Sequence, residues 1–492
     1  TSIVSDIIVN TNTETGSKII EELNNSSTVT HLSLMVISGI SEKDTTKLNT
    51  LSENNKNQIE ELTESAVKNA EASQEDADLI AKIVSTSSDE VINNIMEEVS
   101  KNSTEEKQTL SAQVLKAIVD SNSGKIDIIN DDVKDTMISQ TIESAQNQQE
   151  GTGVQQDQDM TSIVSDIIVN TNTETGSKII EELNNSSTEN NLSLKIISGI
   201  SEKDTTKLNT LSENNKEQMD TLTESAVKNA GASQEDADLI AQVVAEVSDE
   251  MANKLISEVT KNSTEENQSL SAKVLKSIVE SNPDKMETLS DENKDNMITQ
   301  TIKAAKNQSE GTSTDDIDLT NTIAEIISSS GSEITSKVLE ELSNSSQGSD
   351  SKLSLQVVNN LTKQENYEEK MEILEVTSPT IGNSISKLIE DAVKNATSEE
   401  DLELVTSIVE KSKGTIGDKI INSANKNEAS KKKITDIIIK VVEKNPEKAL
   451  EIINKNKDTN TITKIIKNKI ENGEAVNTDD FIDVFEKNVS PN

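Results

Sequence analysis

The chain has 492 residues and a formal net charge of −42, and only 32% of its residues are hydrophobic and 1% aromatic. It holds no cysteine and no arginine, which excludes disulfides, thiolate metal sites and bidentate guanidinium clamps on phosphate. Strong negative charge and a lack of aromatic stacking platforms disfavour phosphate-rich ligands, so we expect no nucleic-acid partner.

The sequence repeats with a period of 160 residues. Residues 1–28 recur verbatim as residues 161–188, and a third, diverged copy begins near Asn321. Each copy also reads as two related units of about 80 residues, marked by an acidic pair before an apolar residue. The repetition predicts three domains: copy 1 (1–160), copy 2 (161–320), and a diverged copy 3 with a Lys-rich, Phe-containing C-terminal cap (321–492).

Apolar residues inside each unit follow helical spacing. Two such stripes are Val91, Ile92, Ile95, Met96 and Val99, and Leu110, Val114, Leu115, Ile118 and Val119. Both predict helices with one narrow apolar face. We expect four or five helices of about 10–15 residues in each unit, joined by short polar turns.

Helix starts are predicted from capping residues. Ser73 followed by Asp76 resembles a capping box, as does Ser103-Thr104 followed by two glutamates. In Asn282-Pro283, asparagine suits an N-cap and proline the first helical position. Thr161 follows an acidic helix start that Thr1 lacks, so we expect Thr1 to lie inside a helix whose first turn is missing.

Two stretches rich in Gly, Gln, Ser and Thr predict flexible seams between copies, at residues 146–156 and 307–316. The fold class that follows is all-α, with tandem helical-hairpin repeats forming an elongated α-solenoid-like array and no β-sheet. Low hydrophobicity and high charge also suit a disordered chain, but a disordered chain would not keep Ile and Val in register. No heptad pattern persists, which disfavours a coiled coil.

No residue indicates catalysis. Nucleophile-elbow and phosphate-loop motifs are absent, so we expect no enzyme. The acidic pairs resemble ligands for hard cations, but acids in a first helical turn also complement the helix dipole, which is the interpretation we favour. His31, the single histidine, is replaced by Asn191 in copy 2. We therefore expect no cofactor and only weak, diffuse association of Ca²⁺ or Mg²⁺.

A lysine-rich segment, residues 429–457, stands out near the C-terminus. Residues 411–470 hold 15 lysines against seven acids within an acidic chain. The segment either docks on an acidic protein surface or caps the array. The docking candidates are Lys431, Lys432, Lys433, Lys440, Lys444 and Lys448. Phe481 and Phe485 lie in a short helix expected to lock onto the last hairpin.

These features predict a non-enzymatic, acidic, α-helical spacer or interaction array. We expect it to be a segment of a larger microbial surface or adhesin-like protein, outside the cell, with a cytoplasmic location left open. The alternative is an intracellular α-solenoid scaffold that binds a protein partner. Partners would be another protein or a second copy. No apolar run reaches the length of a membrane span, so we expect no membrane insertion by this segment.

Overall fold

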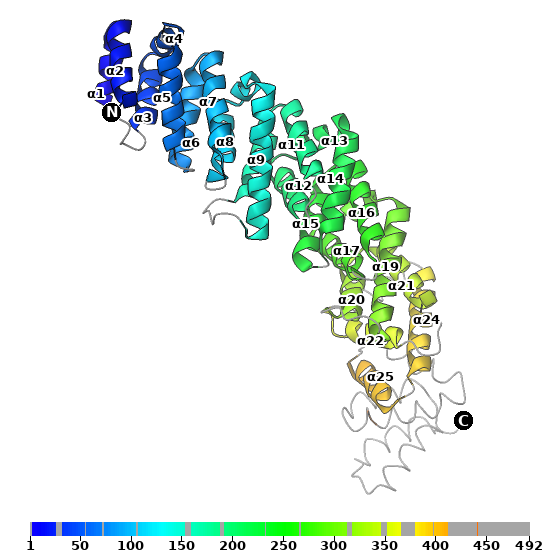
Figure 1. Cartoon of the computed structure of the whole chain (residues 1–492). Coiled ribbons are helices and arrows are strands. Elements are labelled where there is room, and N and C mark those ends of the chain that lie inside the picture. The colour runs from blue at the N-terminus through cyan, green and yellow to red at the C-terminus, as the bar shows by residue number, and fades with distance from the viewer. Residues whose placement is uncertain are drawn as a thin grey trace, which may run out of the picture. The chain divides into compact units, whose positions relative to one another are not determined.

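The computed structural model is built of helices, and contacts divide it into two units, 1–231 with 242–258 and 232–241 with 259–492. It describes residues 2–25, 32–54, 56–70, 73–104, 107–152, 159–186, 191–231, 233–264, 267–311, 317–345, 352–365, 379–396, 398–411 and 440. No strand occurs among these residues. Figure 1 shows the helices in chain order.

Unit 1 contains the helices of copy 1 and the first part of copy 2. These helices are α1 (Ser2–Asn10), α2 (Thr13–Asn25), α3 (Leu32–Lys43), α4 (Thr45–Asn54), α5 (Lys56–Asn69), α6 (Gln74–Thr86), α7 (Asp89–Asn102), α8 (Leu110–Asn122), the 3₁₀ helix η2 (Ser123–Ile128), α9 (Asp131–Glu150), α10 (Met160–Asn170), α11 (Thr173–Asn185), α12 (Leu192–Lys203), α13 (Thr205–Asn214) and α14 (Lys216–Asn229).

Unit 2 contains the rest of copy 2 and the described part of copy 3. Its helices are α17 (Leu270–Ser281), α18 (Lys285–Thr288), α19 (Asp291–Ser309), α20 (Leu319–Ser329), α21 (Ser332–Ser345), α22 (Leu353–Leu361), α24 (Pro379–Asn395) and α25 (Glu399–Lys411). Two further helices, α15 (Gln234–Glu246) and α16 (Asp249–Asn262), have residues in both units.

Within each unit the helices stack in two layers. In unit 1 one layer runs α1, α3, α6, α8, α10, α12, and the other runs α2, α5, α7, α9, α11, α14, each helix packing on the next. Unit 2 repeats the scheme with α17, α20, α22 and α25 in one layer and α19, α21 and α24 in the other. Because each helix contacts only near neighbours, this is the packing of an α-solenoid-like repeat array.

Apolar stripes hold the layers together. Every residue of the two predicted stripes is at most 5% exposed, from Ile92 at 0% to Val119 at 5%. The predicted helices and their buried faces are therefore confirmed, and so is the all-α, tandem-repeat fold class. Ser, Thr and Asn are weak helix formers, so this burial is what keeps the helices formed.

The acidic pairs begin helices, as the sequence predicts. Asp159 and Asp318 are N-caps of α10 and α20, where each carboxylate accepts a hydrogen bond from a first-turn backbone N–H. Asp76 instead is the third residue of α6, capped by Ser73 in the predicted box. The same sequence marker thus occupies two different positions at its helix starts, both near the positive end of the helix dipole.

Two other predicted helix starts are wrong. Ser103 ends α7 instead of starting a helix, because its hydroxyl donates to the carbonyl of Val99. Asn282 is the C-cap of α17, and the N-cap position of the next helical turn, α18, is held by Asp284 without a side-chain capping bond. In both cases a polar residue closes the preceding helix.

The predicted flexible seams are partly helical. Helix α9 continues through residue 150 and stops at Gly151, whose φ of 67° is left-handed. Glycine adopts this conformation without the steric cost that other residues have, so it ends the helix here. Residues 153–156 and 312–316 of the seams lie outside the described part of the chain.

The predicted division at 160 and 320 follows the sequence repeat, whereas the contact division falls near residues 231–259. The helix pattern does recur at the repeat period: α10, α11 and α12 follow α1, α2 and α3. The assignment of the copies as separate domains stays a prediction.

Candidate functional site: the interfaces between repeat copies

Each described interface between successive copies lies within one compact unit. Copy 1 meets copy 2 where α8 and α9 pack on α10 and α11, in unit 1. Copy 2 meets copy 3 where α17 and α19 pack on α20 and α21, in unit 2. These two interfaces are the only places where one copy's side chains are seen to recognise another's within the described residues.

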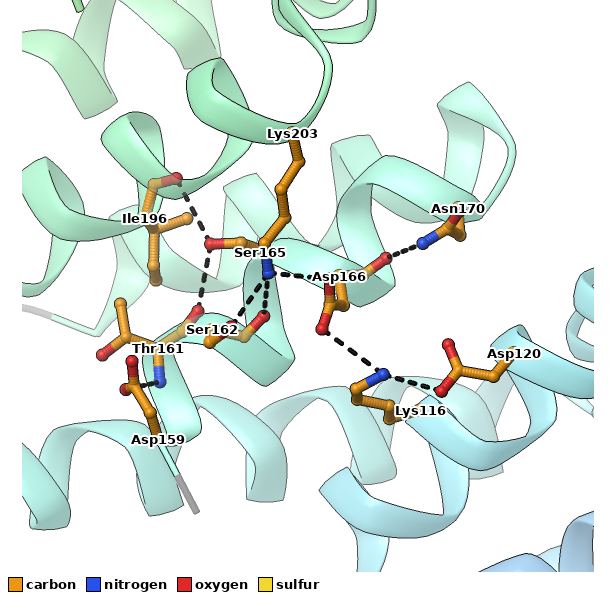
Figure 2. A network of polar contacts seen from close by, with 10 residues as sticks. All are labelled: Lys116, Asp120, Asp159, Thr161, Ser162, Ser165, Asp166, Asn170, Ile196 and Lys203. Carbon is orange, nitrogen blue, oxygen red and sulfur yellow. Dashed lines mark hydrogen bonds and ion pairs between the residues drawn. The ribbon is translucent and has the colours of Figure 1, made fainter. Parts of the chain in front are cut away.

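Lys116 of α8 connects the copies in the first layer. Its ammonium lies 3.3 Å from Asp166 of α10 and 2.7 Å from Asp120 of its own helix (Figure 2). The other carboxylate oxygen of Asp166 lies 2.7 Å from Lys203 of α12. Since the side chains of Lys116 and Asp166 are only 24% and 23% exposed, water screens this pair less than a surface pair.

The next interface repeats this arrangement with a longer acid. Lys276 of α17 lies 2.6 Å from Glu325 of α20 and 3.9 Å from Glu280 of its own helix. Lys276 and Glu325 occupy the places of Lys116 and Asp166. The pairing of lysine with carboxylate is therefore kept although the acid has changed.

Burial and pairing act oppositely on these two lysines. Burial lowers the pKa of Lys116, but hydrogen bonds and charges of Asp120 and Asp166 raise it, and the net pKa lies above the ordinary value. Burial likewise lowers the pKa of Lys276, while Glu325 and Glu280 raise it further than burial lowers it. Both ammonium groups are thus held in the charged form at neutral pH.

The second layer has its own ionic link. Lys178 of α11 lies 3.0 Å from Asp135 and 3.5 Å from Asp131 of α9. In unit 2, Lys337 of α21 lies 2.5 Å from Asp295 and 3.8 Å from Asp291 of α19. The α19–α21 contact has a further link, since Lys294 of α19 lies 2.9 Å from Glu333 of α21. Each interface therefore joins the copies through lysine–carboxylate pairs on both layers.

Beside the first ionic link, α10 and α12 approach closely. The hydroxyl of Ser165, which is 0% exposed, donates to the carbonyl oxygens of Thr161 at 3.0 Å and Ile196 at 3.4 Å (Figure 2). Gly199 of α12 faces it, and a Cβ there would come within 2.5 Å of this hydroxyl. Glycine is required at this crossing by space and not by backbone conformation.

Copy 3 changes both partners of this contact together. Ala324 of α20 stands in the place of Ser165, and Asn360 of α22 in that of Gly199. The buried Asn360 amide donates 2.8 Å to Thr320 and 3.4 Å to Asp318. Loss of the hydroxyl leaves room for a side chain, which finds its own hydrogen-bond partners.

The verbatim repeat places one sequence in two surroundings. Ile163 and Ile167 of α10 are 5% and 1% exposed beneath α8 and α9. Their counterparts in α1, Ile3 and Ile7, are 74% and 46% exposed. Because the local sequence is the same, the difference comes from packing alone.

A polar groove opens in unit 2 between the end of α16, the start of α17 and α19. Its cavity volume is about 700 Å³. The lining residues are Thr260, Lys261, Ser263, Thr264, Gln268, Gln300, Lys303, Ala304 and Asn307. Lys303 stands where copy 1 has Glu143, and both side chains are exposed. The groove of copy 2 is therefore more cationic than the matching surface of copy 1.

Of the predicted docking lysines, only Lys440 lies in the described part of the chain. Its ammonium pairs with Glu399 and lies 3.8 Å from Glu403, both in α25. Lys440 thus takes part in packing within copy 3. Lys431, Lys432, Lys433, Lys444 and Lys448 lie outside the described residues, as do His31 and the two phenylalanines.

Sequence reasoning missed the interface lysines Lys116 and Lys178. A signal was available: lysine recurs one period later at Lys276, and at Lys337 in copy 3, with an acid retained at each partner position. The partners are separated by about 45–50 residues in the chain, as in the pairs of Lys116 with Asp166 and Lys178 with Asp131. Helical spacing alone does not reveal such distant pairs.

The fold and these interfaces define the class of protein, an α-helical tandem-repeat array. No family model matches the chain, and no curated protein matches it. A solved structure titled "Structure of APUM23-GGAAUUGACGG" is 10% identical, covering 89% of this chain and 98% of that chain at a TM-score of 0.20. Another, titled "Circular tandem repeat protein with novel repeat topology and enhanced subunit contact surfaces", is 12% identical, covering 99% and 95% at 0.21.

The predicted exclusion of nucleic acid is corrected by these comparisons. APUM23 is also matched in a structure titled with GGAGUUGACGG, at 10% identity and a TM-score of 0.21. Both nucleotide sequences in these titles contain uracil and are therefore RNA. Two of the solved structures that resemble this chain thus contain a protein together with RNA. The exclusion drawn from net charge is wrong. The low TM-scores assign no RNA site to the present chain.

Among the described residues, no helix is both long and apolar enough to cross a membrane.

Proposed function

We propose that the chain is a non-enzymatic helical-repeat scaffold whose exposed groove holds a protein partner. The observation that carries this proposal is that the contacts between copies are kept while an exposed residue of the groove changes from copy to copy. Lysine-to-acid links recur at both interfaces, while the groove residue Glu143 of copy 1 becomes Lys303 in copy 2. A fixed frame with variable exposed residues is what a binding array needs.

The chemistry of the groove suggests the kind of partner. Lys261 and Lys303 line it together with hydroxyl and amide side chains, and Ala304 is the one apolar residue among the described residues of the lining. In copy 1 the counterpart of Lys261, Lys101, pairs at 2.8 Å with both Glu97 and Glu98. Copy 2 has Ser257 in place of Glu97 but keeps Glu258 in place of Glu98, so Lys261 has one acid fewer beside it than Lys101. An acidic, polar protein segment fits such a cationic groove.

A matched pair of variants tests the scaffold. The wild-type chain, Lys303→Glu and Glu143→Lys would be isolated under native conditions from the cells that produce the protein. We expect a protein partner at constant stoichiometry with the wild type, and a loss of about tenfold or more for Lys303→Glu, since one reversed contact charge costs over 1 kcal/mol. Glu143→Lys, which lies on the copy 1 surface, serves as the control and should leave recovery unchanged.

Two results would reject the scaffold. One is the absence of any stoichiometric partner for all three proteins. The other is equal recovery with Lys303→Glu and the wild type, which would place the partner elsewhere. Circular dichroism of each variant checks that the helices are intact, because both substituted residues are exposed.

The recurrence of the interface favours a second candidate, an acidic spacer within a larger microbial surface protein. Since Lys116 faces Asp166 and Lys276 faces Glu325, copies can be added or removed without creating a mismatched contact. A spacer tolerates such changes in length. Isolates that differ in the number of 160-residue copies, in a gene product with a secretion signal, would support it. A fixed copy number and an intracellular product would oppose it.

A further inference from the structure

Among the described residues no helix covers the outer face of α1 and α2, and copy 2 shows which helices cover the same sequence there. We propose that this face, formed by Ile3, Ile7, Asp6 and Lys18, docks the α8–α9 helix pair of another repeat of the same kind. The partner chemistry is specific: a helix with lysine at the place of Lys116, followed by a helix with aspartates at the places of Asp131 and Asp135. This interaction surface is separate from the groove.

The apolar part of the face is read directly from copy 2. Ile163 and Ile167 are covered where α10 packs on α8 and α9, and they are 5% and 1% exposed. Ile3 and Ile7 belong to the same 28-residue sequence and are 74% and 46% exposed. Exposed isoleucines grouped on one helix are a surface that favours burial against a partner.

The polar part of the face shows the same difference. Lys178 reaches Asp131 and Asp135 of α9 and is 28% exposed. Its counterpart Lys18 pairs only with Glu14 one turn earlier among the described residues, and its side chain is 70% exposed. The aspartates of an α9-type helix are therefore what Lys18 would meet in place of Glu14.

Asp6 completes the match. It pairs with Lys43 of α3 at 2.5 Å, as Asp166 pairs with Lys203. Its second carboxylate oxygen corresponds to the one that Lys116 contacts in copy 2. Asp6 is 53% exposed, against 23% for Asp166. A lysine from the partner repeat would therefore find its acceptor already held in position.

The α1–α2 face of a second chain complements this face less well than an α8–α9 pair does. Two such faces would bury their isoleucines together, but Asp6 and Lys18 would lose the particular lysine and aspartates that they meet in copy 2. The complement seen inside the chain satisfies the apolar and charged groups at once. Charge complementarity of this kind selects one partner over others.

The test extends the full chain at its N-terminus with a second set of residues 1–160, so that an α8–α9 pair precedes Thr1. The chain has no cysteine, so Ile3→Cys or Lys18→Cys supplies a single thiol for maleimide labelling. Ile163→Cys in the unextended chain gives the rate of a covered site. We expect labelling at position 3 to slow by about tenfold or more on extension and to approach the rate at 163, because covered sites react only after local opening.

A control and two contrary results complete the design. Lys116→Glu in the added copy alone should restore part of the fast labelling, since it places like charges against Asp6. Unchanged fast labelling at both position 3 and position 18 in the extended chain would overturn the proposal. Slow labelling in the unextended chain, with light scattering at twice the chain mass, would overturn it in favour of pairing between two α1 faces. The Lys18→Cys variant keeps the test valid if Ile3→Cys disturbs α1.

Discussion

The hydroxyl of Ser165 occupies the space that a side chain on Gly199 would need. A Cβ on Gly199 would lie 2.5 Å from Ser165 Oγ and 3.1 Å from its Cβ. In copy 3 the serine is Ala324 and the glycine is Asn360. The two positions therefore change as a pair, which makes the crossing of α10 and α12 a test of packing in this fold.

Gly199→Ala should destabilise the chain by about 1–3 kcal/mol, because the added methyl overpacks a buried crossing. Adding Ser165→Ala should recover part of this loss, since it removes the clashing hydroxyl. Urea denaturation of both single variants and the double variant measures the coupling. Simple additivity of the two single effects would show that the residues do not share the space.

The ionic link between copies is tested with the verbatim repeat as its own control. Asp166→Asn removes a carboxylate that faces two lysines, whereas Asp6→Asn removes one that faces a single lysine. We expect the first to cost about 1 kcal/mol and the second about 0.5 kcal/mol or less, given that both pairs are partly open to solvent. The urea midpoints of the two variants decide the matter. Equal shifts would mean that Lys116 contributes nothing at the interface.

Buried isoleucines of the interface are tested in the same way. Ile167→Ala should cost about 2–4 kcal/mol because it leaves a cavity beneath α8. Ile7→Ala changes the identical position of α1, where the side chain is 46% exposed, and should cost under about 1 kcal/mol. Thermal melting followed by circular dichroism gives both values. A larger loss from Ile7→Ala would contradict the packing described for copy 2.

Alkaline pH should weaken the second interface. The pKa of Lys276 is raised above 10.5 in the folded chain, where burial lowers it less than Glu325 and its neighbours raise it. Because this pKa is raised on folding, Lys276 contributes fully to the folding stability at pH values below 10.5, the ordinary pKa of the unfolded chain. The contribution is lost as the pH rises through the pKa of the folded chain. Between about pH 9 and 12, the melting temperature should therefore fall less steeply with pH for Lys276→Met than for the wild type.

Lys207 supplies a control of opposite sign. Burial lowers its pKa below 10.5, and its ammonium donates 2.5 Å to the carbonyl of Thr171. Its burial favours the neutral form, so its unfavourable contribution is relieved as pH rises through the lowered pKa. The melting temperature of Lys207→Met should accordingly fall more steeply with rising pH than that of the wild type. The same slope for both lysine variants would show that pairing at Lys276 does not set the pH response.

The sequence predicts local structure well here and distant contacts poorly. The stripe from Val91 to Val99 defines a buried face because its spacing follows one helix. Ser103 misleads because serine caps either end of a helix, and only the contact with Val99 distinguishes the ends. The pairing of Lys116 with Asp166 depends on how layers stack, which no short pattern encodes.

The seams show a different limit. The composition of residues 146–156, rich in Gly and Gln, predicts a linker, yet glutamine and glutamate form helices readily, and α9 extends to Glu150. Gln148 explains the extension, since its side-chain oxygen accepts from the backbone N–H of Met160 at 2.7 Å. The end of α9 thus holds the first residue of α10. Gln308 and Leu319 repeat the contact at 2.8 Å.

Lys116 and Lys276 make the same kind of contact, each with a carboxylate on the first helix of the next copy. A folding chain therefore has two carboxylates, Asp166 and Glu325, that can accept the same lysine. During folding, Lys116 of α8 can pair with Asp166 on α10 or, in a mispaired chain, with Glu325 on α20, because the two acids differ by one methylene. Only the short connection after Gly151 favours the neighbour, because the entropy of loop closure rises with chain separation. Exchange between similar faces is a known route to misassembly in repeat proteins. Refolding should therefore leave more mispaired chains than the melting temperature alone suggests.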